Sequence, residues 1–119
     1  MFRRWFDRSS KADEDGFYET ALPAAVVTAG SLHVLHVGGR KLLVTRVDGQ
    51  LQAFSHVCPH AAADLSKGRL RGSEIKCPEH GYTFDVRTGR ATWPPGEGCH
   101  LTRFAVRKEE GTVRIKLEG

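Results

Sequence analysis

The chain has 119 residues, of which 39% are hydrophobic and 27% charged, with 18 lysines and arginines against 14 acidic residues. This length suits one domain with a modest core, and no apolar run approaches the roughly 18–20 residues of a membrane span. The net charge of +4 is spread along the chain without basic blocks or interleaved aromatic residues, so no nucleic-acid partner is expected. Three cysteines cannot form a paired disulfide framework, which favours metal ligation in a reducing compartment and predicts a cytoplasmic protein.

Residues 1–16 are mostly polar and charged, and they are predicted to form a flexible tail before a domain over residues 17–119. The large apolar side chains of this tail, Phe2, Trp5 and Phe6, would share one face of a short helix. A helix of this length is marginal in water, so the tail is expected to fray or to lie on the domain. It has no apolar stretch of the kind that an export signal needs, and export is not expected.

After the tail, the sequence is typical of short strands separated by glycine turns. The predicted strands cover residues 17–21, 31–37, 41–47, 50–55, 101–108 and 112–117, with a further hairpin within 82–93. The predicted turns are Gly38-Gly39, Asp48-Gly49, Thr88-Gly89 and Glu110-Gly111. Leu22-Pro23 is expected to end the first strand, because proline cannot donate a ladder hydrogen bond. Many short strands at regular spacing predict an all-β domain of the sandwich or partial-barrel type.

Two matched clusters of metal-binding residue types lie within CPHAAADLSKGRLRGSEIKCPEH, residues 58–80. Their potential ligands are Cys58, His60, Cys77 and His80. Buried cysteines with incidental histidines would not explain why each cluster combines both residue types in a loop between strands. A tetrahedral zinc site accepts two cysteines and two histidines. A binuclear iron–sulfur cluster also accepts them, because each loop can give its cysteine to one iron and its histidine to the other.

Two details weigh against zinc. Structural zinc sites usually pair like ligands as C-x-x-C or H-x-x-x-H, whereas each loop here supplies one of each type. Such sites also typically hold together a small unit with little core, while this chain has enough predicted strands to fold without a metal. A zinc-stabilised binding module is therefore the weaker alternative.

The C-x-H and C-x-x-H motifs, separated by residues 61–76, resemble those of Rieske-type ferredoxins. The resemblance covers about residues 17–118. It includes LSKG at 65–68, similar to the end of the family's first cluster loop, and HGYTFDVRTG at 80–89, similar to its segment after the second ligand pair. Trp93-Pro94-Pro95 stands where the family has a proline-containing loop over the cluster.

This resemblance implies a Rieske-like fold of stacked antiparallel sheets, with a cluster-binding subdomain of two loops and one [2Fe–2S] cluster per chain. By the matching positions, Cys58 and Cys77 would bind the inner iron, and His60 and His80 the outer iron. Gly81 would allow a tight turn beside the cluster.

The predicted reduction potential is low for this family. Respiratory members carry a further cysteine in each loop, joined as a disulfide, whereas this chain has Ala61, Ala62, Ala63 and Glu79 at the candidate positions. They also carry a serine after the His-Gly pair, where this chain has Tyr82. With fewer hydrogen-bond donors toward the cluster sulfurs, the reduced state is stabilised less than in respiratory members. A carboxylate near the cluster would also repel the added electron. We therefore expect a potential near the bottom of the roughly −150 to +300 mV Rieske range.

The resemblance implies a soluble one-electron carrier. The chain has neither room for the mononuclear-iron domain of ring-hydroxylating oxygenases nor a glycine-rich dinucleotide fingerprint. It is therefore expected to be no enzyme, and to pass electrons from a reductase to an oxygenase or another terminal redox enzyme. Besides the zinc module, the alternative is a redox or regulatory subunit of a nitrite-reductase-like complex. His60 and His80 would form the exposed docking tip, Cys99 would be a packing residue, and His56 would lie near the cluster.

Overall fold

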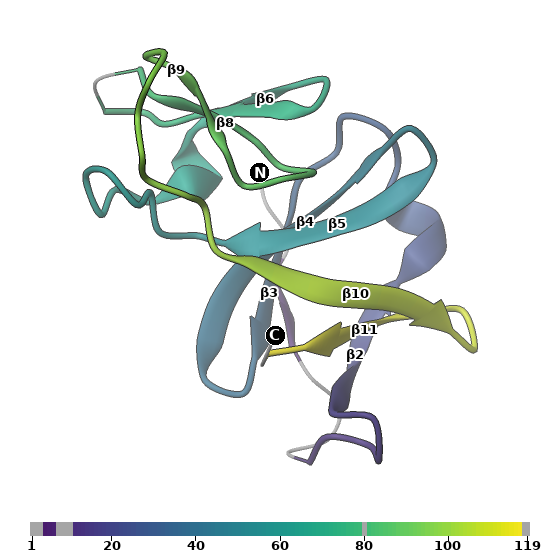
Figure 1. Cartoon of the computed structure of the whole chain (residues 1–119). Coiled ribbons are helices and arrows are strands. Elements are labelled where there is room, and N and C mark those ends of the chain that lie inside the picture. Colours follow the sequence, from purple (N-terminus) through teal and green to yellow (C-terminus); the bar gives the residue numbers. More distant parts are fainter. Residues whose placement is uncertain (1–3, 7–10, 80, 118–119) are drawn as a thin grey trace.

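The computed structural model describes residues 4–6, 11–79 and 81–117, and within these ranges the chain forms eleven strands in two sheets and two short 3-10 helices (Figure 1). The larger sheet has, in spatial order, β1 (Arg4–Phe6), β3 (His33–Val37), β4 (Arg40–Val47), β5 (Gln50–Ser55), β10 (Arg103–Glu109), β11 (Thr112–Lys116) and β2 (Phe17–Pro23). The smaller sheet has β6 (Arg69–Arg71), β7 (Glu74–Lys76), β8 (Thr83–Asp85) and β9 (Ala91–Trp93). The helices are η1 (Ala24–Val26) and η2 (Leu65–Lys67).

The predicted all-β class and hairpins are confirmed. At the turn from β4 to β5, Asp48 and Gly49 both have positive φ, 52° and 80°, as the tight hairpin turn that matches strand twist requires. Glu110 and Gly111 take the same conformation between β10 and β11, with φ of 53° and 81°. Consecutive strands of the larger sheet from β3 to β11 pair antiparallel.

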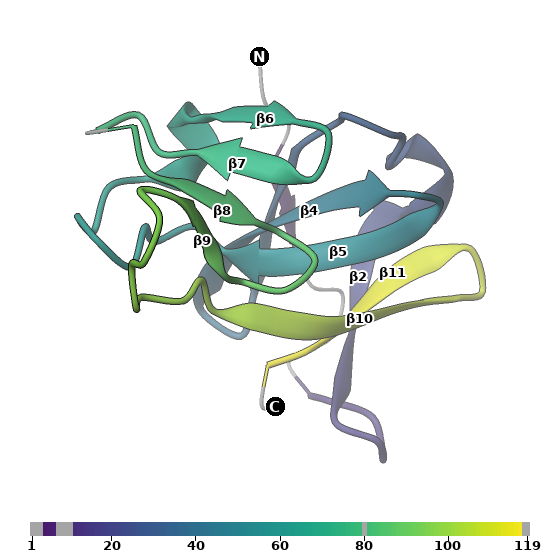
Figure 2. The same cartoon turned by 45° about the horizontal axis from the view of Figure 1, so that its top comes forward.

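The strands β3, β4 and β5 are buried on both faces, so two apolar cores share them. Leu42 and Val44 of β4 belong to a core that the larger sheet encloses by curving, with side chains from β2, β10 and β11 opposite them. Leu43 points to the other face, into a core closed by the smaller sheet, which lies over β4 and β5 in Figure 2. This double burial explains why the 42–44 stretch is uninterruptedly apolar.

The N-terminal segment differs from the prediction. Residues 4–6 form a strand, β1, which pairs in parallel with β3 at the sheet edge, so the predicted helix is wrong there. A helix needs more residues than this segment has to become stable, whereas a strand gains its hydrogen bonds from a neighbour that already exists. The other helix-face residue, Phe2, lies outside the described residues, and the domain boundary after residue 16 stays a prediction.

Strand β2 ends at Pro23, as predicted, and its position at the other end of the sheet order tolerates a proline. One further element, a hairpin of the smaller sheet, was not predicted from the sequence. Between the two ligand motifs, β6 and β7 form a hairpin that turns at Gly72, whose φ is 60°. Among the described helices, none is long and apolar enough to cross a membrane.

Candidate metal centre

The first ligand loop follows β5 and closes on itself by backbone hydrogen bonds. The Cys58 N–H donates to the Ala63 carbonyl at 2.9 Å, and the Ala62 N–H donates to the Cys58 carbonyl at 2.8 Å. Ala62 takes a left-handed conformation, with φ of 55°, to complete the turn. These bonds fix the Cys58 backbone while the loop projects beyond the sheet.

The second ligand loop joins β7 to β8 and is closed at its base. The Cys77 N–H donates to the Tyr82 carbonyl at 2.7 Å, and this bond joins the two ends of the loop. Gly81 has a φ of 70°, a conformation that side-chain-bearing residues rarely adopt. The tight turn expected at Gly81 is therefore confirmed.

Both cysteines point inward. Cys58 is 1% exposed and Cys77 is 2% exposed, and both belong to the core beneath the smaller sheet. Burial raises the pKa of the Cys77 thiol to about 11, with the backbone N–H of Glu79 acting in the opposite direction and the neighbouring Cys58 thiol adding to the rise. Two convergent thiols, with an amide donor already aimed at one sulfur, fit ligands that share an iron ion.

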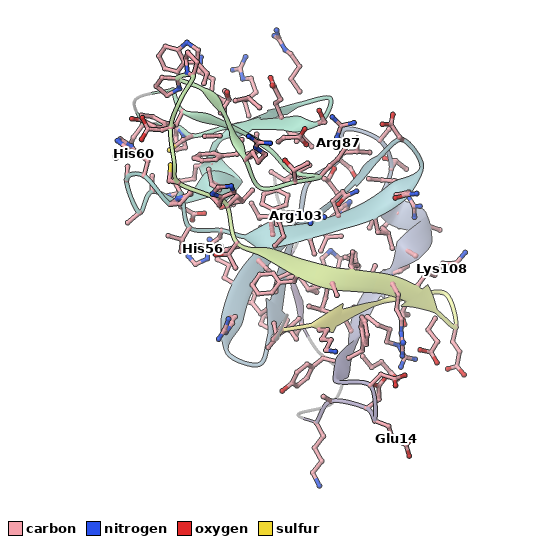
Figure 3. The ribbon with its side chains drawn as sticks, viewed as in Figure 1. Glu14, His56, His60, Arg87, Arg103 and Lys108 are labelled. Atoms are coloured by element: carbon pink, nitrogen blue, oxygen red, sulfur yellow. The ribbon has the colours of Figure 1, made fainter. Side chains whose placement is uncertain are left out.

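His60 lies on the surface. Its ring stacks on that of Tyr82, with the ring centroids 3.6 Å apart and the planes within 13° of parallel. Tyr82 belongs to the second loop, so this stack joins the tips of the two loops. Figure 3 shows His60 at the outer end of the loops and His56 nearer the larger sheet.

The fourth predicted ligand, His80, lies outside the described residues. Among the described residues, no three or more Cys, His, Asp or Glu side chains are grouped so that they could hold a metal. The structure thus brings the thiols of Cys58 and Cys77 together and stacks His60 on Tyr82 of the second loop, and the complete ligand set stays a prediction.

Several other site residues can now be placed. Cys99 is half-buried and packs against the core that holds the ligand cysteines, as expected for a packing residue. His56 contacts the Lys41 carbonyl through Nδ1 at 2.9 Å, which ties it to β4. The stack of His60 on Tyr82 and the backbone N–H of Glu79 aimed at Cys77 were not predicted from the sequence. The aromatic Tyr82, directly after His-Gly, was a signal for the stack.

The donor set defines the class of site. The two buried thiols converge inside the fold, and an imidazole lies at the surface. This arrangement suits a binuclear iron–sulfur cluster in which one iron is bound by cysteines and the other by histidines. A fold of stacked sheets with two such loops is therefore suited to hold an iron–sulfur cluster.

The chain belongs to the Rieske [2Fe-2S] domain family, whose model matches residues 18–113. It is 36% identical over 97 residues to the ferredoxin component of the naphthalene 1,2-dioxygenase system of Pseudomonas putida, covering 82% of this chain and 92% of that protein. It is 34% identical over 90 residues to apoptosis-inducing factor 3 of Mus musculus, covering 75% of this chain. The chain spans only 15% of the length of that longer relative.

Solved structures agree with the sequence relatives. A chain in the complex of reduced oxygenase and oxidized ferredoxin in carbazole 1,9a-dioxygenase superposes with a TM-score of 0.71 at 35% identity, covering 80% of this chain and 97% of that one. The predicted Rieske-like fold and Rieske-type [2Fe–2S] cofactor are thereby confirmed, and the family membership overrides the zinc alternative. Ferredoxin components of dioxygenase systems are among the relatives that this chain covers over most of their length.

Proposed function

We propose that this protein carries single electrons in the cytoplasm, from a reductase to the oxygenase of a multicomponent aromatic-ring dioxygenase system. The observation that carries the proposal is the contrast in burial between Cys58 and Cys77, which are at most 2% exposed, and His60, which is exposed. A carrier needs a redox centre anchored in the protein and reachable at one edge. The ferredoxin components among the relatives support both the role and the class of partner.

In this proposal Cys58 and Cys77 bind one iron as thiolates, and His60 and His80 bind the other through imidazole nitrogens. When bound, the cluster supplies a reversible one-electron couple. The chain's own residues do the rest: the closed loops fix the thiol positions, and the Tyr82 ring orients His60 by stacking on it. The exposed loop tips then form the contact point for both redox partners.

The reduction potential should lie below zero. Neutral imidazoles make the site less negative than four thiolates would, which raises the potential above the roughly −400 mV of plant-type ferredoxins. Within the Rieske range, however, Tyr82 supplies no short side-chain hydroxyl to the cluster, since its phenol oxygen lies 3.5 Å from a Glu97 carboxylate oxygen. The exposed Glu79 carboxylate beside Cys77 further disfavours an added electron.

The test is anaerobic purification followed by electron paramagnetic resonance and a potentiometric titration. We expect a red-brown protein that takes up one electron reversibly and gives a rhombic signal with an average g below that of an all-cysteine cluster. His60→Cys should lower the potential, because a thiolate adds negative charge at the iron. The matched control, His56→Gln, should leave it unchanged. Stoichiometric zinc with no signal, or an unchanged potential in His60→Cys, would overturn the proposal.

A further inference from the structure

The outer face of the β6–β7 hairpin carries a basic groove beside the second ligand loop. It encloses about 590 Å³, and its floor includes Cys77. The charged side chains that line this groove are Lys67, Arg69, Arg71, Lys76 and Glu74. Four cations against one carboxylate make it strongly positive.

The strand register explains how these cations gather. Arg69 lies directly opposite Lys76, and Arg71 lies opposite Glu74. The side chains of these two cross-strand pairs, three cations and one carboxylate, therefore share one face of the hairpin. The alternate residues, Leu70 opposite Ile75, face the core on the other side. Two like charges placed directly opposite each other destabilise a hairpin, so folding does not account for the Arg69–Lys76 pair.

These cations are not neutralised by the fold. In the described part of the chain, the ion pairs involve other cations such as Lys41, Arg107 and Arg114, and none of the four groove cations takes part in one. All four are exposed. Their positive field is therefore directed to solvent.

An exposed tryptophan borders the same groove. Trp93 is 53% exposed, and it lies opposite Thr83, which also lines the groove. A Cβ built on Gly81 would lie 3.4 Å from Lys76 Cε and 3.9 Å from Trp93 Cζ3, so the ammonium stem and the indole ring both lie beside Gly81 of the second ligand loop. Tryptophan and arginine are the residue types that most often dominate binding energy at protein interfaces.

We propose that the basic groove and Trp93 form the docking surface for a redox partner whose own docking face is acidic, with an apolar recess that receives the indole. This inference rests on the proposed function, since the partner must exchange electrons at the adjacent loops. A protein partner fits better than a nucleic acid, because the groove's cations come from one short hairpin and the adjoining η2, next to the Glu74 carboxylate and the exposed Trp93 ring. A phosphate backbone is usually tracked by a longer basic stripe.

The first test measures the local field with two small oxidants of opposite charge, anionic ethylenediaminetetraacetatocobaltate(III) and cationic tris(phenanthroline)cobalt(III). The reduced protein gives one electron and the cobalt passes from Co(III) to Co(II), which stopped-flow absorbance follows. Rising salt should slow oxidation by the anion about tenfold and accelerate oxidation by the cation. In the Arg69→Glu/Lys76→Glu variant, the salt dependence for the anion should vanish or reverse.

The control is Arg40→Glu/Lys108→Glu, which changes the net charge by the same amount. Both residues are exposed, and Figure 3 shows Lys108 at the far end of the molecule from His60. Arg40 borders a different pocket, together with Tyr18 and Lys116. The control should change either rate less than about twofold, because neither residue lines the groove beside the second ligand loop. Equal effects of the two double variants would refute a localised docking field.

The second test uses binding, measured by fluorescence anisotropy with a labelled 20-residue polyglutamate and a labelled 10-base-pair DNA duplex. Polyglutamate should bind the wild-type protein, and its affinity should fall about tenfold in Arg69→Glu/Lys76→Glu and little in the control. DNA binding much tighter than polyglutamate, lost in the same variant, would instead assign the groove to nucleic acid. The inference would be refuted if the protein titrates reversibly with one electron but its oxidation rates do not depend on salt and it does not bind polyglutamate. The electron-transfer role would then remain intact.

Discussion

Asp64 ties the first ligand loop to the larger sheet and predicts a measurable pH dependence of stability. Its carboxylate accepts hydrogen bonds from the Ser66 N–H at 2.9 Å and the Ser66 hydroxyl at 2.7 Å, which cap η2. The Lys41 ammonium on β4 donates to the other oxygen at 2.6 Å. These contacts hold the end of the loop that begins at Cys58.

The magnitude follows from the pKa of this carboxyl. Burial raises the pKa of Asp64, but the hydrogen bonds from Lys41 and Ser66 outweigh it and lower the pKa from 3.8 to about 2. The side chains of Asp64 and Lys41 are 26% and 23% exposed, so solvent screens the pair only partly. The difference corresponds to about 2 kcal/mol of stability. Because the folded-state pKa is the lower one, this contribution is complete above pH about 5 and falls to about half of that value at pH 3.

The perturbation is Asp64→Asn, which keeps the shape of the side chain and removes its charge. At pH 7 the unfolding temperature of the cluster-bound protein should fall by about 10 °C, and at pH 3 the gap from the wild type should be about half as large. Differential scanning calorimetry at one scan rate measures both gaps. Glu14→Gln is the control, because Glu14 is exposed and Figure 3 shows it at the opposite end of the molecule. A gap below about 2 °C at pH 7, or one that does not shrink on acidification, would refute the assignment.

Three further substitutions probe the site from different sides. Phe84→Ala should destabilise the fold by about 3–5 kcal/mol in thermal unfolding, because this fully buried ring fills the core shared by the ligand cysteines. Gly81→Ala should destabilise it by about 1–2 kcal/mol and speed cluster loss to a chelator, owing to its positive φ; Gly98→Ala, in open space, should do neither. Tyr82→Leu should speed cluster loss several-fold by removing the stack on His60, worth about 0.5–1.5 kcal/mol, and Tyr82→Phe should retain wild-type kinetics.

The hairpins were predictable because their signals are local. A dipeptide such as Asp48-Gly49 determines a turn by its own backbone preferences, and the strands on either side are long enough to show their apolar residues. The β6–β7 hairpin gives a weaker signal: Gly72-Ser73 is a turn dipeptide, but each strand has three residues and one core-facing side chain, Leu70 or Ile75. Its formation depends on pairing with β8, which the sequence does not reveal.

The same distinction explains the N-terminal error and the charge distribution. Nothing within residues 4–6 distinguishes a helical turn from a strand, and the choice is made by pairing with β3 far along the chain. Likewise, Lys67, Arg69, Arg71 and Lys76 are separated by neutral and acidic residues, so the chain shows no basic block. Antiparallel pairing brings Arg69, Arg71 and Lys76 onto one face, and Lys67 lines the same groove from η2. Only then does a modest net charge become a localised field.

The ligand motif is visible in the sequence and stays a prediction as a set, whereas the burial of its cysteines and the exposure of His60 depend on the fold. Each Cys-Pro pair begins immediately after a strand end or a bridge residue, at the point where the backbone leaves the sheet. The cysteine side chain of each pair still faces the core. His60 follows two residues later, after the loop has left the core, and it is therefore exposed. Although Cys58 and His60 are only two residues apart, the Cys58 thiol therefore faces the core and the His60 imidazole faces solvent. That geometry is what a carrier requires, because the buried end retains the cofactor while the exposed end meets the partner.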